Sequence, residues 1–189
     1  MTVEAHVVYR VGVTGDADAV AALHAESWRR HYRGAYSDTY LDGDIVADRR
    51  KVWAGRMAHP REDQCTIVAT QGAILVGFIH IALDADAMWG ALIDNLHVTA
   101  ERTRGGIGST LLRTAGGVVA ERRPSWGMYL WVLEQNAAAQ RFYRARGGVC
   151  VERAHVTPPG GDPSRLTGQP SKLRYAWSDP TALTFREQE

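Results

Sequence analysis

The chain has 189 residues, of which 45% are hydrophobic and 23% are charged. A chain of this length suits one domain and can bury enough surface to fold without a metal or a disulfide. Its 22 basic and 21 acidic residues nearly cancel, to a formal net charge of +1. We therefore expect neither a nucleic-acid partner nor an anionic membrane partner.

Composition and termini further predict a soluble cytoplasmic protein. Cys65 and Cys150 show no CxxC or Cys/His spacing, so we expect reduced thiols and no metal site. The first ten residues lack the basic and apolar regions of a secretory signal. The apolar run at 73–83 is broken by His80 and is too short to cross a bilayer.

The N-terminal half predicts a strand, two helices and a hairpin. Spacing of apolar and β-branched residues indicates these elements. The strand covers Val7–Val13, the helices cover Ala17–Tyr32 and about Ser37–Met57, and the hairpin strands cover Cys65–Thr70 and Ala73–Leu83. Gly43 interrupts the second helical pattern, and glycine weakens a helix.

The C-terminal half alternates strands and helices, which indicates an α/β or α+β layered domain. Strands are expected at Ala91–Val98, Met128–Leu133, Val149–Val156 and Leu173–Trp177, and helices after the glycine turn Arg104–Gly108 and at Asn136–Arg146. Gly116-Gly117 in the first of these helices favours close packing on a sheet. We expect one domain over 1–189, with a core at about 7–156, a flexible loop at 157–171, and a final strand and tail at 172–189.

The stretch Leu96–Ser109 runs from a strand end through a glycine turn into a helix. Such a turn directs backbone N–H groups and the positive helix end at one point, where phosphate binds. Arg102 and Arg104 add guanidinium donors. The alternative is a tight turn with solvated arginines. No lysine follows Gly108, which excludes a Walker A loop, and Leu111 breaks the dinucleotide fingerprint.

Two motifs resemble the general N-acetyltransferase (GNAT) superfamily. The first is Leu96-His97-Val98 followed by the turn Thr103–Gly108, where Thr103 departs from the family's usual Gln or Arg. The second runs from Leu130 to Tyr143 and includes Asn136. The resemblance extends over about Val7–Val156. It implies an α+β fold with a mixed, mostly antiparallel sheet of about 6–7 strands, about 4 helices and a coenzyme A cleft between splayed strands.

The resemblance also implies an acetyl-CoA site. Its expected residues are Leu96, His97, Val98, Thr103, Arg104, Gly105, Gly106, Ile107, Gly108, Ser109, Asn136, Ala139 and Tyr143. Asn136, Ala139, Gln140 and Tyr143 also have the spacing of one helix face, which supports the grouping independently.

Acetyl transfer needs a base, a stabilised oxyanion and an acid for the leaving thiolate. The resemblance assigns the acid to Tyr143 and the oxyanion to a bulge N–H near Leu96–Val98. Asp94 and Glu134 are the main candidate bases, with Glu26 and His97 as others.

The sequence signals for the site of the acceptor amine are less specific. Trp28, Tyr32 and Tyr36 either flank a cationic amine or pack between helices. The loop at 157–171 is either a flap over the acceptor cleft or a disordered insert.

We predict an N-acetyltransferase that moves the acetyl group of acetyl-CoA to an amine of a small molecule or peptide. The alternatives are a non-catalytic acetyl-CoA-binding sensor or interaction module and an unrelated phosphate-binding α/β protein. The sequence leaves a homodimer open and does not identify the acceptor.

Overall fold

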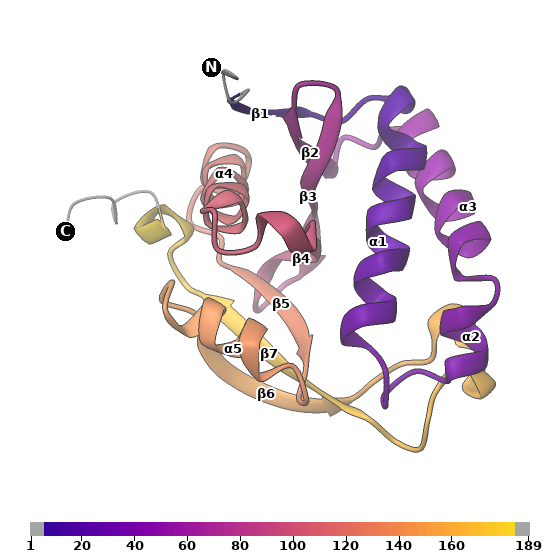
Figure 1. Ribbon diagram of the computed structural model, residues 1–189. Coiled ribbons are helices and arrows are strands. Elements are labelled where there is room, and N and C mark those ends of the chain that lie inside the picture. Colours follow the sequence, from indigo (N-terminus) through magenta and orange to yellow (C-terminus); the bar gives the residue numbers. More distant parts are fainter. Residues whose placement is uncertain (1–5, 184–189) are drawn as a thin grey trace.

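A seven-stranded mixed sheet forms the centre of the computed structural model, which describes residues 6–183 (Figure 1). The strand order is β1-β2-β3-β4-β5-β7-β6. All neighbours are antiparallel except β4 and β5, which are parallel. The strands are β1 (Val7–Val11), β2 (Gln64–Gln71), β3 (Ile74–Asp86), β4 (Gly90–Val98), β5 (Met128–Leu133), β6 (Val149–His155) and β7 (Ser171–Trp177). The predicted α+β class with a mixed, mostly antiparallel sheet is confirmed.

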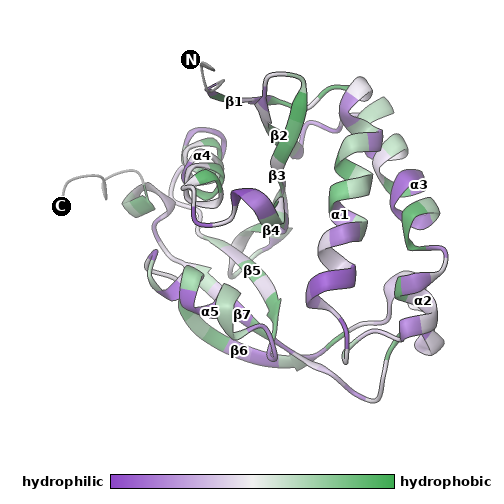
Figure 2. Ribbon diagram, in the orientation of Figure 1, coloured by the Kyte–Doolittle hydropathy of each residue, from purple (hydrophilic) through white to green (hydrophobic). Residues whose placement is uncertain are grey.

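Helices cover both faces of the sheet (Figure 1). They are α1 (Ala17–His31), α2 (Asp38–Asp42), α3 (Ile45–Ala58), α4 (Ile107–Arg122) and α5 (Ala137–Arg144). The apolar side of α4 packs with Ile79, Ile81 and Ile93 of the sheet. On the opposite face, α1 and α3 pack against Val68 and Phe78. Figure 2 shows hydrophobic residues along the β2–β3 hairpin and hydrophilic residues on the turn between β4 and α4.

The helix predicted over about 37–57 is two helices in the structure. The break lies at Gly43, which ends α2 in a non-helical conformation, and Asp44 then precedes α3. Residues 6–183 therefore contain five α-helices where about four were expected. The other predicted elements recur with ends that differ by a few residues, and Met128–Leu133 coincides with its prediction.

Strands β4 and β5 are paired only at their first residues. The pairs are Ala91 with Met128 and Leu92 with Tyr129, although β4 has nine residues and β5 has six. Gly90 allows the close approach at this end, because a Cβ on it would lie 2.0 Å from the carbonyl oxygen of Gly127. Beyond Leu92 the two strands diverge, and no strand in the described part of the chain pairs with β4 on that side.

A β-bulge lies in β4 where the strands begin to diverge. Asn95 is opposite His80 and Ile93 is opposite Ile81, which leaves Asp94 as the extra residue. The bulge therefore precedes the stretch Leu96–Val98, where we expected it. The extra residue interrupts the alternation of side chains between the two faces of β4, so spacing in the sequence alone does not say which face Asp94 occupies.

Two C-terminal segments pack differently from expectation. The helix glycine Gly116 makes a close contact, but with the carbonyl of Pro180, 2.8 Å from where a Cβ would lie, and not with the sheet. The loop at 157–171 contains two short 3₁₀ turns. It is hydrogen-bonded to the segment after α1 through Ser37 N–H to Arg165 O (2.9 Å) and Thr167 N–H to Ala35 O (2.9 Å). The predicted tail lies partly outside the described residues, at 184–189.

Candidate active site

A cavity of about 790 Å³ opens between the diverging strands β4 and β5. Residues from five parts of the chain meet on its wall. They come from α1 (Ser27, His31) and Tyr32 after it, β4 (Ile93–Val98), the β4–α4 turn and α4 (Arg102, Thr103, Arg104, Gly106, Gly108, Ser109), β5 (Leu130–Leu133), and α5 with its flanks (Asn136, Ala138, Ala139, Arg141, Phe142, Tyr143, Arg146).

The glycine turn leaves the start of α4 open to this cavity. Gly106 precedes the helix with a φ of 79°, a left-handed conformation that side chains disfavour. No side chain caps the helix, and its first N–H groups have no partner within it. Gly108 and Ser109 also line the cavity. The wall thus combines free N–H donors with a positive helix end, as anion binding requires.

Two predicted members of the turn lie elsewhere. Ile107, the first residue of α4, is buried in the core, and Gly105 is exposed but does not line the cavity. Thr103 does line it, yet its hydroxyl donates to the carbonyl oxygen of Ala100 at 2.8 Å. That hydroxyl is therefore used within the turn.

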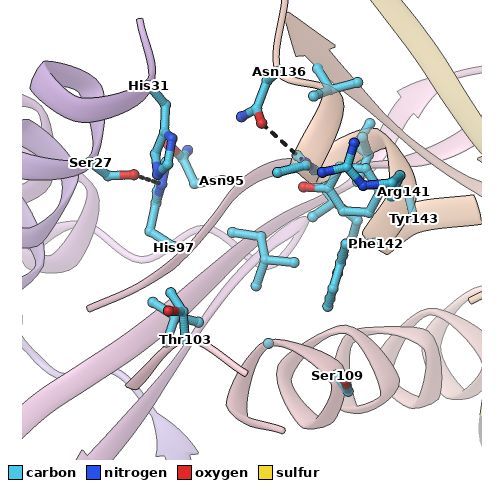
Figure 3. Close-up of a pocket in the computed structure, with 18 of the residues that line it drawn as sticks. Ser27, His31, Asn95, His97, Thr103, Ser109, Asn136, Arg141, Phe142 and Tyr143 are labelled. Carbon is cyan, nitrogen blue, oxygen red and sulfur yellow. Dashed lines mark hydrogen bonds between the residues drawn. The ribbon is translucent and has the colours of Figure 1, made fainter. Parts of the chain in front are cut away.

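Helix α5 forms the opposite wall. Asn136 is its N-cap, and the side-chain oxygen accepts the N–H of Ala139 at 3.1 Å. Asn136, Ala139 and Tyr143 line the cavity, as the one-face spacing predicts. Gln140, the fourth residue of that pattern, instead donates to the carbonyl of Glu134 at 2.6 Å. Figure 3 shows Asn136, Arg141, Phe142 and Tyr143 together on this side.

Tyr143 is a buried phenol on the cavity wall, with 9% of its surface exposed. Burial, with a smaller effect of Tyr32, raises its pKa above the ordinary value of 10.0. Its hydroxyl has no hydrogen-bond partner among the described residues. The group is therefore protonated at neutral pH and available as a donor.

The wall formed by β4 and α1 carries an ordered imidazole. His97 Nδ1 lies 2.7 Å from Ser27 Oγ, and its ring packs against that of His24 in a tilted arrangement, with centroids 4.8 Å apart. Burial lowers the pKa of His97 to about 3, so the ring is neutral at physiological pH. Figure 3 shows Ser27, His31, Asn95 and His97 together, facing the α5 wall. Leu96 and Val98 also line the cavity.

The structure separates the two candidate carboxylates. Asp94 lines the cavity, where it pairs with Arg56 (2.8 Å) and accepts a hydrogen bond from Asn95 Nδ2 (2.8 Å). Glu134 does not reach this cavity. It pairs with Arg153 at 2.8 Å beside a second cavity of about 410 Å³. The guanidinium holds the pKa of Glu134 below its usual range, and Glu134 is thus a member of a surface ion pair.

Of the three aromatic residues expected at the acceptor site, only Tyr32 lines the cavity. Trp28 and Tyr36 are buried in a small core between α1 and α2. The cation over the Trp28 ring is Arg49, 4.4 Å from the ring centroid. Packing, the alternative to amine binding, therefore describes Trp28 and Tyr36. The loop at 157–171 does not line the main cavity either.

Several wall residues escaped the sequence analysis. Ser27 and His31 are spaced i, i+4 on α1, so one helix face presents both, and this spacing was the available signal. Arg141 and Phe142 lie within the second motif, and Arg146 follows it. Arg146 contacts Ser109 across the cavity wall at 2.9 Å, a pairing that no local pattern reveals.

No group of three or more His, Cys, Asp or Glu side chains among residues 6–183 is arranged to hold a metal ion. Over the same residues, no helix combines the length and apolar character needed to cross a membrane.

Comparison with known proteins agrees with this geometry. The profile of the acetyltransferase (GNAT) family matches residues 21–147. A probable N-acetyltransferase of Mycobacterium tuberculosis is 29% identical over 135 residues, which cover 69% of this chain and 73% of that protein.

Solved structures share the fold. PaiA N-acetyltransferase from Thermoplasma acidophilum, in complex with coenzyme A, matches with a TM-score of 0.70 at 21% identity, covering 91% of this chain and 99% of that chain. The ribosomal-protein-S18-alanine N-acetyltransferase from Escherichia coli matches with a TM-score of 0.62 at 20% identity, covering 90% of this chain and 92% of that chain. At these identities the likeness concerns the fold.

Proposed function

Because this chain belongs to the acetyltransferase (GNAT) family, we propose that it transfers the acetyl group of acetyl-CoA, the cosubstrate of that family, to a primary amine of a small molecule or peptide. The observation that carries the proposal is the divergence of β4 and β5. It opens one cavity that has the glycine turn at the start of α4 and the phenol of Tyr143 on its wall.

The chemistry requires a neutral amine, because an ammonium ion cannot attack a thioester. Amines have pKa values of about 8 to above 10, so a group in the cavity must take a proton. Asp94 is our proposed base, directly or through water. Its position on the cavity wall supports this role, and its pairing with Arg56 fixes its orientation.

Negative charge then develops first on the acetyl oxygen and later on the sulfur. For the oxygen we propose main-chain N–H groups of β4 beside the bulge, since this edge of the strand has no partner. For the sulfur we propose Tyr143 as the proton donor. Its protonated, unpaired hydroxyl supports that assignment.

The proposed function predicts amine-dependent release of free thiol from acetyl-CoA. The measurement is thiol production over a panel of small-molecule amines and peptides with free amino termini, with matched acids and alcohols as controls. Binding of acetyl-CoA without turnover on any amine would instead favour the non-catalytic sensor.

Asp94→Asn is expected to lower kcat about 10- to 100-fold, because the substitution removes a general base while keeping the shape of the side chain. Coenzyme affinity, measured by calorimetry, should stay within about twofold of wild type. The matched change Glu134→Gln removes the carboxylate outside the cavity and should leave kcat unaltered. A loss in Glu134→Gln with full activity in Asp94→Asn would assign the base to Glu134.

A further inference from the structure

Arg146 places a positive charge beside the first turn of α4 without a carboxylate partner. Its Nε donates to Ser109 Oγ at 2.9 Å, and its Nη2 donates to the same oxygen. Nη1 donates to the carbonyl of Phe142 at 3.1 Å, and the guanidinium lies 3.8 Å from the centroid of the Phe142 ring. The main chain is held by Trp177 Nε1, which donates to Arg146 O at 2.8 Å. The side chain is thus fixed in place.

The position of the Arg146 charge beside the start of α4 is electrostatically unfavourable. Burial lowers the pKa of Arg146, which reports a cost of keeping the charge there. The positive end of the α4 dipole lies next to it, and like charges repel. Within residues 6–183 no Asp or Glu forms an ion pair with this guanidinium. An anion in the cavity would offset both effects.

The contacts of Arg146 also determine what Ser109 can do. A guanidinium has donors only, so Ser109 Oγ accepts from Arg146, and its own hydrogen stays free to donate. Arg146 and Ser109 both line the cavity beside the open N–H groups of α4. Together they present side-chain and main-chain donors to one place. A planar guanidinium suits a phosphate that offers two oxygens.

A purely structural role would be a tie between α5 and α4. That role needs no charge, because the acceptors of Arg146 are a hydroxyl and a carbonyl, and its packing partner is a phenyl ring. Thr103, at the position where the resembling family usually has Gln or Arg, turns its hydroxyl to Ala100 O. Arg102 and Arg104 of the turn also line the cavity, and Arg146 adds a guanidinium from a segment that is distant in sequence.

We propose that Arg146 is a coenzyme-binding residue that contacts the diphosphate of coenzyme A and orients Ser109 to donate to the same group. This inference rests on the proposed function, since it assumes coenzyme A as the ligand. It assigns to this chain a phosphate contact from the segment after α5, added to the backbone donors of the glycine turn.

The test is calorimetric binding of coenzyme A, 3′-dephospho-coenzyme A and pantetheine to wild type, Arg146→Met and Arg146→Lys. Methionine keeps the packing on Phe142 but removes the charge. We expect Arg146→Met to weaken both phosphorylated ligands by the same factor, about 10- to 100-fold, and to leave pantetheine binding unaltered. The affinity of Arg146→Lys for these two ligands should lie between those of wild type and Arg146→Met, because lysine keeps the charge without the planar fork. Arg144→Met is the matched control, since Arg144 is on α5 but does not line the cavity.

Thermal unfolding of each variant checks that the fold is intact. If Arg146→Met does not fold, the binding data for Arg146→Lys alone test the proposal. Unaltered coenzyme affinity in the variant used would overturn the role of Arg146. An equal loss of affinity for pantetheine would also overturn it, because it would indicate a structural role for Arg146. A loss of affinity confined to coenzyme A would overturn it too, because it would indicate a contact with the 3′-phosphate. These outcomes leave the proposed function intact. A wild-type protein that binds none of the three ligands would overturn both proposals.

Discussion

Gly106→Val is expected to weaken coenzyme A binding by at least about 100-fold, because it acts on the backbone and on the cavity together. Gly106 has a φ of 79°, and a left-handed conformation costs a residue with a Cβ roughly 1–2 kcal/mol. A β-branched side chain such as that of valine makes the left-handed conformation less favourable still. Nothing lies within 4 Å of a Cβ built at this position. The new isopropyl group would therefore occupy the open space in front of the N–H donors of α4.

Gly72→Val separates strain from binding. Gly72 has a φ of 59° and open space where a Cβ would lie, but it is in the β2–β3 turn, away from the cavity. Both variants should lose about 1–3 kcal/mol of unfolding free energy in denaturant titrations. Only Gly106→Val should lose coenzyme affinity, measured by calorimetry. If Gly106→Val binds coenzyme A normally, the glycine turn does not hold its phosphates.

Tyr143→Phe is expected to lower kcat by about 100-fold or more, since it removes the donor to the leaving thiolate. Coenzyme affinity should change by less than about threefold, because the ring that lines the cavity remains. Burial raises the pKa of Tyr143 above 10.0. The hydroxyl thus stays protonated through the neutral and mildly alkaline range, and its ionisation should not reduce activity below pH 10.0.

Tyr175→Phe is the matched control. Tyr175 is fully buried, its ring centroid lies 6.0 Å from that of Tyr143, and its hydroxyl has no hydrogen-bond partner within residues 6–183. Removing that hydroxyl should leave kcat unaltered and should not reduce stability. Steady-state kinetics and thermal unfolding test both statements. Full activity in Tyr143→Phe would exclude Tyr143 as the acid, and a water molecule or the solvent would then protonate the thiolate.

Much of the fold could be predicted because its signals are local. The run Met128–Leu133 is apolar and β-forming between turn residues, and it is a strand with those ends. Asn136 caps α5 through a hydrogen bond to Ala139, a contact three residues away. The break at Gly43 was signalled by the glycine itself, but spacing alone did not decide between a weak point in one helix and two helices.

The candidate site, too, could be predicted only where its signals are local. The sequence was sufficient to predict the glycine turn, the start of α4 and the α5 face with Tyr143, because each depends on residues within one turn or one helix face. It did not determine which side chains reach the cavity. Alternation and helical spacing assign residues to a face, but they do not say what covers that face.

The three-dimensional packing of the chain set the remaining features of the site. It placed Asp94 at a bulge on the cavity wall and Glu134 in an ion pair outside it. It buried Trp28 and Tyr36, and it brought Arg146 to Ser109, 37 residues away in the chain. The physical reason is the divergence of β4 and β5. A cavity between two strands is a property of how they are paired, and long-range pairing sets its walls from segments that no local pattern connects.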